Sequence, residues 1–246
     1  MSNRRSLAVV AAALFLLLLV ARLPASIATA LAPPTVIANN PSGTLWRGNA
    51  AHVQVNVNGH WFALGGVDWE LHPLGLLFGD ALTLKSSWGR QQLDLSTGVA
   101  FNGNVTVSDV SVRADTSWIK NLLPLFVAGD ITADIESLGV TAAGVPKEIT
   151  GRVVWENAAW QAMGGDVSLG TYAVDITTTD QGISGTVVTL KGALDLTGEF
   201  TLKGNRYSVT ADLSGTAARN EAFQQAIALM AVPTESGYRI DLSGTL

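Results

Sequence analysis

The chain has 246 residues, of which 14% are charged and none is cysteine, and its formal net charge is −5. This length suits one large or two small domains, and the lack of cysteine excludes disulfides and cysteine-based metal sites. Residues 1–22 carry three arginines and no acid, so the remainder has 12 basic and 20 acidic residues, a net charge of −8. Such an acidic balance argues against a nucleic-acid-binding protein, because phosphates require a basic surface.

The N-terminus contains the first clear pattern. Arg4 and Arg5 precede fifteen uncharged, mainly apolar residues at 7–21, and Arg22 follows. Fifteen helical residues reach about 22 Å, which is short of a hydrocarbon core of about 30 Å, so a cleaved signal peptide and a retained anchor are both possible. Both alternatives leave the two arginines in the cytoplasm and carry the rest across the membrane. We predict a cytoplasmic tail over 1–6 and an anchor, or signal peptide, with the start of a linker over 7–31.

From Gly43 onward, apolar residues alternate with Thr, Ser, Asp and Asn, for example over 53–57 and 207–213. A period of two is typical of antiparallel strands with one buried and one solvated face. Turn dipeptides such as Asn58-Gly59 and Asn102-Gly103 recur between these segments. They indicate hairpins within a long meander.

A sequence repeat divides this β-rich part. The segment 43–51, GTLWRGNAA, returns 108 residues later as 151–159, GRVVWENAA. An internal repeat indicates two related halves, which we predict over 40–145 and 146–246. Each half contains one amphipathic segment, at 117–127 and at 219–231, which predicts one short helix per repeat.

Two short helices cannot cover so many one-sided strands. The predicted fold is therefore mainly β: an N-terminal anchor helix, then a two-repeat antiparallel meander in a strongly curved sheet, either a half-barrel or folded over. Strand parity places eight apolar side chains on one face, with residues such as Thr83 and Asp94 on the other. The eight are Leu82, Leu84, Leu93, Leu95, Leu194, Leu196, Phe200 and Leu202. We predict that the curl of the sheet buries them, whereas a sheet that stays open would leave an apolar groove.

Residue types that carry catalysis or bind metals form no recognisable pattern. His52, His60 and His72 lack the pairing that a zinc site uses, and the chain has no nucleophile elbow or phosphate loop. Its acids fall mainly at polar strand positions, where a solvated face is the ordinary interpretation and a glycosidase-type carboxylate pair is the alternative. We expect no catalytic residue, no metal site and no cofactor, and a protein that is not an enzyme.

The tryptophans gather at corresponding parts of the two halves. Trp46, Trp61 and Trp69 lie in the first half, and Trp155 and Trp160 lie in the second. We interpret them as core side chains that pin the repeat, the alternative being a docking surface.

An ordered series of glycine, tryptophan and apolar positions resembles the protein N family of the bacterial type II secretion system. No single motif in it is highly specific, but the series extends over nearly the whole chain. The residues that carry it are Gly43, Leu45, Trp46, Gly48, Ala50, Trp69, Pro73, Gly151, Trp155, Ala158, Gly170 and Gly244.

The resemblance implies a single-pass inner-membrane protein with a cytoplasmic N-terminus and a periplasmic β domain, and it favours the anchor over the signal peptide. It implies an accessory role in exporting folded proteins across the outer membrane, with other secretion components as partners and no catalytic residues. A more distant likeness to AsmA-type β-groove proteins implies the alternative, a periplasmic protein that binds or transfers lipid. An exported hydrolase is a third alternative.

Overall fold

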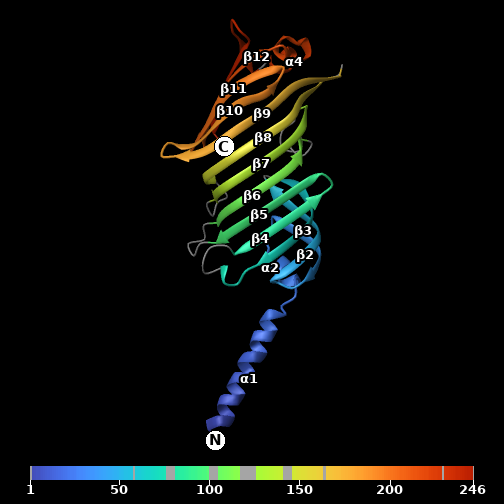
Figure 1. The fold of residues 1–246 in the computed structure, drawn as a ribbon, viewed down its shortest axis with the longest axis vertical. Coiled ribbons are helices and arrows are strands. Elements are labelled where there is room, and N and C mark those ends of the chain that lie inside the picture. Colours follow the sequence, from blue (N-terminus) through green and yellow to red (C-terminus); the bar gives the residue numbers. More distant parts are fainter. Residues whose placement is uncertain are drawn as a thin grey trace. The chain divides into compact units, whose positions relative to one another are not determined.

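The computed structural model describes residues 2–57, 59–75, 81–99, 105–116, 126–140, 146–162, 165–228 and 230–245. The chain divides into two compact units, residues 1–88 (unit 1) and residues 89–246 (unit 2). Both units consist mainly of antiparallel strands, as Figure 1 shows.

Unit 1 begins with two helices, α1 (Ser2–Ala21) and α2 (Ser26–Leu31). Helix α1 forms because its Ala- and Leu-rich run has a high intrinsic helix propensity. The large apolar side chains described along it are exposed, from 48% at Val20 to 74% at Leu7. In the described part of the chain, no helix meets the combined length and hydropathy that a membrane-spanning helix requires.

Four strands complete unit 1, and each pairs antiparallel with the next. They are β1 (Val36–Gly43), β2 (Arg47–Val57), β3 (His60–Leu71) and β4 (Leu82–Trp88). The core of the unit contains Ala25, Ala50, Val53, Val67 and Trp69, so the start of α2 packs against one face of β2 and β3.

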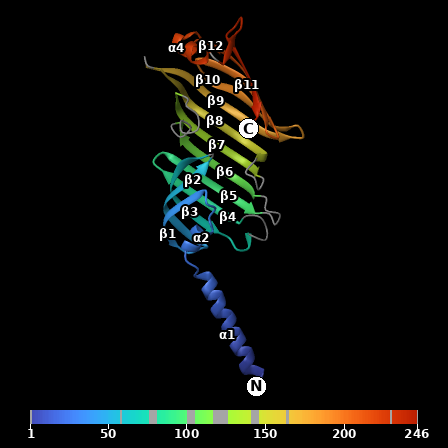
Figure 2. The same cartoon turned by 180° about the vertical axis from the view of Figure 1, so that it is seen from behind.

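Unit 2 continues the meander, and Figure 2 shows its strands following one another in sequence order. Each strand from β5 to β11 pairs antiparallel with the strand that follows it in the chain. Strand β12 then pairs with β14, and β13 pairs with the other side of β14. The elements are β5 (Gln91–Val99), β6 (Val105–Asp115), β7 (Val127–Val140), β8 (Pro146–Ala162), β9 (Gly165–Thr179), β10 (Gly182–Gly192), β11 (Leu194–Lys203), β12 (Arg206–Gly215), the 3₁₀ helix η2 (Ala217–Arg219), α4 (Glu221–Ile227), β13 (Ala231–Pro233) and β14 (Tyr238–Thr245).

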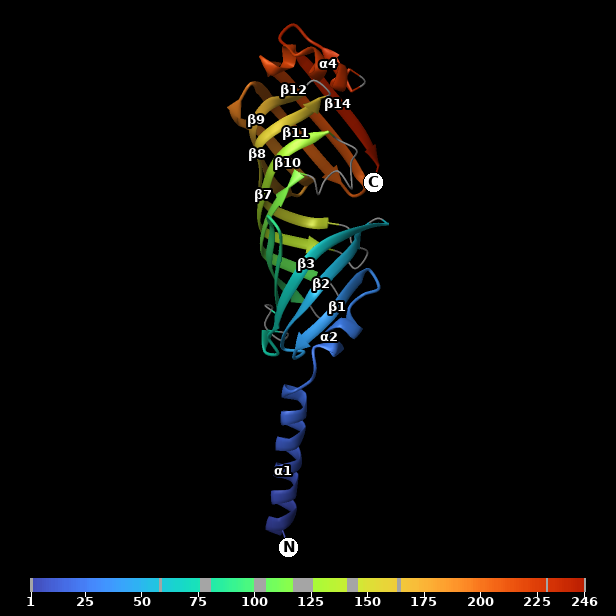
Figure 3. The ribbon, with the colours of Figure 1, turned by 90° about the vertical axis from the view of Figure 1, so that its right-hand side faces the viewer.

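The core of unit 2 lies where η2 and α4 cover one end of the sheet. The side chain of Asn220 accepts a hydrogen bond from the Phe223 N–H (3.2 Å) and so caps α4. Figure 3 shows α4 beside β12 and β14. The buried cluster comprises Ala158, Leu169, Tyr172, Leu194, Leu213, Ala217, Ala218, Phe223 and Ile227.

The repeated Asn-Ala-Ala segments share one structural feature, a buried alanine beside an irregularity of the strand register. Ala50 in β2 and Ala158 in β8 are 1% and 0% exposed, and each adjoins a register shift of its strand. A β-bulge turns a side chain into the packed interior, where a small residue fits and a larger one would not. The sequence repeat therefore coincides with a repeated structural feature.

The prediction of a mainly β, antiparallel meander with few helices is confirmed. Among the described strands, β1 and β13 each pair on one side only, so the sheet is not closed. Its strong curvature stays a prediction.

The helix predicted over 117–127 lies outside the described residues except at its end, where Val127 begins β7. The helix predicted over 219–231 is correct for α4 but wrong at Ala231, which pairs with Ile240 as part of β13. The predicted boundary at 145/146 falls between β7 and β8, which pair with each other, whereas the compact units divide after Trp88. The division into repeats over 40–145 and 146–246 stays a prediction.

Candidate interaction surfaces

The two faces of the unit 2 sheet differ in polarity. Directly paired residues in an antiparallel sheet lie on the same face, so the register shows which side chains share one. One face is apolar across every strand from β8 to β14, and it is called the apolar face here. It includes Val153, Val174 and Val187 on β8 to β10, and Phe200, Val209 and Leu242 on β11, β12 and β14.

Helices cover only part of this apolar face. Leu194 lies under η2 and α4 and is 3% exposed, whereas Leu196 and Phe200 on the same strand are half-buried. The structure also separates the eight predicted residues: Leu82 and Leu84 pack against the core of unit 1, and the other six belong to unit 2. Of the eight, only Leu194 is buried. The other seven are half-buried, namely Leu82, Leu84, Leu93, Leu95, Leu196, Phe200 and Leu202.

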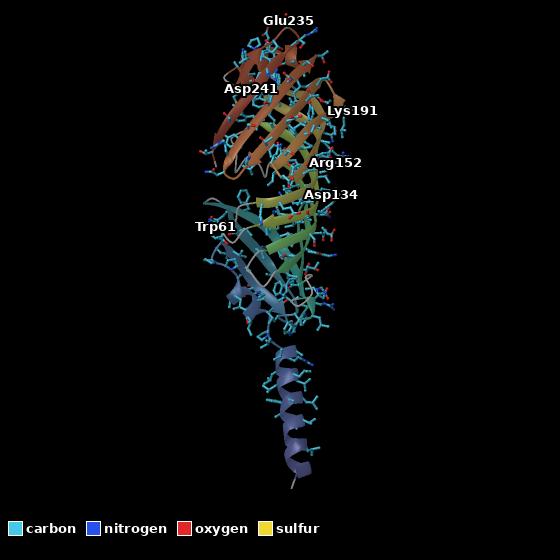
Figure 4. The ribbon with its side chains drawn as sticks, turned by 90° about the vertical axis from the view of Figure 1, so that its left-hand side faces the viewer. Trp61, Asp134, Arg152, Lys191, Glu235 and Asp241 are labelled. Carbon is cyan, nitrogen blue, oxygen red and sulfur yellow. The ribbon has the colours of Figure 1, made fainter. Side chains whose placement is uncertain are left out.

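The opposite face of unit 2 carries charges in register. Asp134, Arg152 and Asp175 are successive cross-strand partners on β7, β8 and β9. The Arg152 guanidinium donates two hydrogen bonds to the Asp175 carboxylate (2.5 and 2.8 Å), and this bonding holds the pKa of Asp175 below its usual value. Figure 4 shows Asp134 and Arg152 on the same side of the sheet. Exposed ion pairs add little stability, so this face is a solvated surface whose charges can orient a partner.

The described residues contain no group of three or more His, Cys, Asp or Glu that could hold a metal ion. The His52 ring packs edge-on against Trp88 (6.2 Å between ring centroids). The Nε2 atom of His72 lies 3.9 Å from Oε1 of Glu70. The side chain of His60 lies outside the described residues. That the protein is not an enzyme stays a prediction.

The tryptophans occupy three kinds of position. Trp69 is buried, with its indole N–H donating to the Leu45 carbonyl (3.1 Å), which confirms its interpretation as a core residue. Trp155 and Trp160 are half-buried and pack against the core of unit 2. The interpretation of Trp61 as core is wrong: it is 45% exposed, because it stands at the start of β3, where few neighbours cover it.

Trp46 behaves differently from Trp155, with which the repeat nearly aligns it. Trp46 is half-buried, and its indole N–H donates to the carbonyl of Val20 in α1 (2.7 Å). Trp155 instead donates to Ala128 on the neighbouring strand (3.2 Å) and contacts Tyr172 (5.9 Å between ring centroids). The contact between Trp46 and Val20 of α1 could not be predicted from the sequence pattern, because the two residues lie 26 positions apart in the chain.

Several glycines of the motif series lie where a side chain would collide with a neighbour. A Cβ on Gly48 would lie 2.5 Å from Cζ2 of Trp69. Gly170 has a φ of 150°, and a Cβ on it would lie 2.3 Å from the Lys191 carbonyl oxygen. Close approach of strands and aromatic rings thus explains why these positions are glycine. Of the other members, Gly43 has φ 88°, Gly151 and Gly244 lie within β8 and β14, and Leu45 and Pro73 lie outside the strands.

These features define an antiparallel β protein whose sheet in unit 2 has one apolar and one charged face, with short helices that cover only part of the apolar side. The family model of the type II secretion system (T2SS) protein N matches residues 34–241, and the chain belongs to this family. The resemblance predicted from the sequence is thus confirmed.

A curated relative agrees with this assignment. The type II secretion system protein N of Aeromonas hydrophila is 27% identical over 214 residues, which cover 80% of this chain and 82% of that protein. No solved structure matches the chain.

Proposed function

We propose that the chain is a non-enzymatic accessory component of the type II secretion system, which assists export of folded proteins across the outer membrane. The observation that carries this proposal is the match of the protein N family over residues 34–241. Its partners are then other components of the secretion system, bound through protein–protein contacts.

An exposed strand edge supports a docking role. Strand β13 pairs only with residues 238–240 of β14, so among the described strands none covers the outer side of β14 over 241–245. An unpaired edge offers backbone groups to an added strand of a partner. Ser243 lies on this edge, and its register partner Ser208 lies within the sheet on β12.

The test combines secretion with crosslinking in the native envelope. Deleting the chain should leave secreted proteins folded in the periplasm, and the wild-type chain should restore their export. A photocrosslinking residue at Ser243 should capture a secretion component, whereas the same residue at Ser208 should not. Unchanged export in the deletion strain would contradict the proposal.

The proposed location is the inner membrane, with the N-terminus in the cytoplasm and the β units in the periplasm. Exposed apolar side chains along α1, and the arginines Arg4 and Arg5 that precede them, support this orientation. Because residues 7–21 reach only about 22 Å, Arg22 must extend its charged head to the interface if the helix spans the bilayer. The intact chain should then resist alkaline extraction from inner membranes, and a soluble form beginning near Pro33 would instead indicate a cleaved signal peptide.

A second candidate function is lipid binding, which the incomplete cover of the apolar face favours. Leu196 is half-buried on this face, and Thr197 is exposed on the opposite one. If lipid fills the face, Leu196→Asp should leave a folded chain that no longer retains phospholipid, while Thr197→Asp should retain it. Native mass spectrometry measures the lipid and thermal unfolding measures the fold. Failure of Leu196→Asp to fold, with no lipid on the wild type, would favour the scaffold role.

A further inference from the structure

Within unit 1, the residues that directly follow α1 are hydrogen-bonded to the start of the β-sheet, so no free linker separates the helix from the strands. The Leu45 N–H donates to the Leu23 carbonyl (2.8 Å), and the Ala25 N–H donates to the Gly43 carbonyl (3.2 Å). Between these bonds, Pro24 forms a β-bridge with Thr44. The residues that follow α1 are therefore held against the end of β1 within two residues of the helix.

Trp46 fastens the helix itself. The last carbonyls of a helix have no partner within it, and the Val20 carbonyl accepts from both the Trp46 indole N–H (2.7 Å) and the Leu23 N–H (3.3 Å). Tryptophan side chains prefer the boundary between water and hydrocarbon, because the ring is apolar and the N–H is polar. The end of α1 and the ring of Trp46 are thus in direct contact.

An exposed apolar side chain lies at the same end of unit 1. The Leu71 N–H donates to the Trp46 carbonyl (2.7 Å), and three residues further on Leu74 is 72% exposed. Three residues span at most about 10 Å, which bounds the separation of Leu74 from this contact. An exposed leucine beside the exit of an apolar helix is suited to a lipid surface.

The charges at this end suit phospholipid headgroups. Arg22 and Arg47 are exposed, and Arg47 pairs with Glu70. The hydrogen bond from Arg47 keeps the pKa of Glu70 below its usual value, so the carboxylate is charged but neutralised by its partner. Arg22 is an exposed positive charge of the kind that anionic headgroups attract.

We propose that the end of unit 1 formed by Arg22, Trp46 and Leu74, the junction surface, rests on the phospholipid headgroups of the membrane that α1 enters. This inference rests on the proposed anchoring of α1. With the linker absent, the strands of unit 1 start at the membrane surface and extend away from it. Trp61 lies near the opposite end of β3, up to about 33 Å from Leu71 along the strand, since ten residues separate them at about 3.3 Å each.

The test uses the full chain, whose lack of cysteine allows single probes. Leu74→Cys and Trp61→Cys, each labelled with an environment-sensitive fluorophore, form a matched pair on exposed apolar sites at the two ends of β3. The chains are reconstituted into phosphatidylethanolamine–phosphatidylglycerol vesicles, with or without headgroup-nitroxide lipids. We expect blue-shifted emission and several-fold quenching by nitroxide at position 74, with neither at position 61.

A third chain, with a long Gly-Ser linker inserted after Arg22 in the Leu74→Cys background, should lose most of that quenching, because a flexible tether frees the unit from the surface. Equal quenching with and without the linker would overturn the role given to the short junction. Vesicle flotation separates the two levels of the proposal. Chains that float but show no quenching at 74, or equal quenching at 74 and 61, overturn the junction surface alone, and chains that do not float overturn the anchor as well.

Discussion

The contact between Gly185 and Phe200 offers a quantitative test of how the apolar face of unit 2 is packed. The two residues are partners across β10 and β11. A Cβ on Gly185 would lie 2.1 Å from Cε1 and 2.5 Å from Cδ1 of Phe200, far inside the ordinary carbon–carbon separation of about 3.5–4.0 Å. The Phe200 ring therefore lies directly on the glycine, as aromatic rings do over strand glycines.

Gly185→Ala should destabilise unit 2 by about 1–3 kcal/mol, the usual cost of forcing a side chain into a packed site. Phe200→Ala should cost about 2 kcal/mol, below the full value for a buried phenylalanine because the ring is half-buried. In the Phe200→Ala background the obstruction is gone, so adding Gly185→Ala should be neutral or stabilise by up to about 1 kcal/mol. The double-mutant cycle then gives a coupling of about 1–4 kcal/mol, the difference between these two effects of Gly185→Ala.

Urea unfolding of the full chain in mild detergent, followed by far-UV circular dichroism, measures the four free energies. Gly66→Ala is the control, because the nearest heavy atom to its added Cβ lies at an ordinary 3.8 Å. If Gly185→Ala costs the same with and without the ring, Phe200 does not cover the glycine and the packing argument fails.

Three further predictions test the cores. Ala158→Leu should destabilise by about 1–3 kcal/mol or more because the bulge site is fully buried, whereas Ala51→Leu on the exposed side of the matching segment should be nearly neutral by the same urea measurement. Trp155→Ala should cost about 2–3 kcal/mol, below the full value for a buried tryptophan because the ring is half-buried, and should remove secretion only through loss of folding. A stable variant that no longer supports secretion would indicate a docking surface instead. Burial raises the pKa of Tyr172 to about 12, so the stability contributed by its neutral hydroxyl is complete below the unfolded pKa near 10. That stability is lost as pH rises toward 12, by about 1–2 kcal/mol after solvent screening is allowed for. Tyr172→Phe should flatten that part of the profile of unfolding free energy against pH. At neutral pH it should lower the unfolding free energy by about 1 kcal/mol, because the hydrogen bond to the Leu194 carbonyl is lost. An unchanged profile would refute the assignment.

The amino-acid sequence by itself determined the strands, their polarity and the family. Strand faces follow from alternation, because successive side chains point to opposite sides, and so Phe200 and Leu196 could be placed on one face and Asp195 on the other. Ala50 and Ala158 could be matched as repeats because each lies at a buried position beside a register shift, where a small residue fits. The short helix near residue 221 was also predictable, since its amphipathic pattern and its Asn220 cap are local features.

Only the tertiary structure decided features that depend on residues distant in the chain. Two of them depend on which segments meet: the hydrogen bond from Trp46 to Val20 and the division of the units after Trp88. Two others depend on where strands begin and end: the exposure of Trp61 and the end of the last helix before Ala231. Local patterns carry the period of an element but not its partners, because pairing is set by long-range packing and loop closure. For the same reason the cover of the apolar face could not be predicted: alternation shows that Leu194 and Leu196 share a face, whereas their different burial depends on where η2 and α4 return to the sheet.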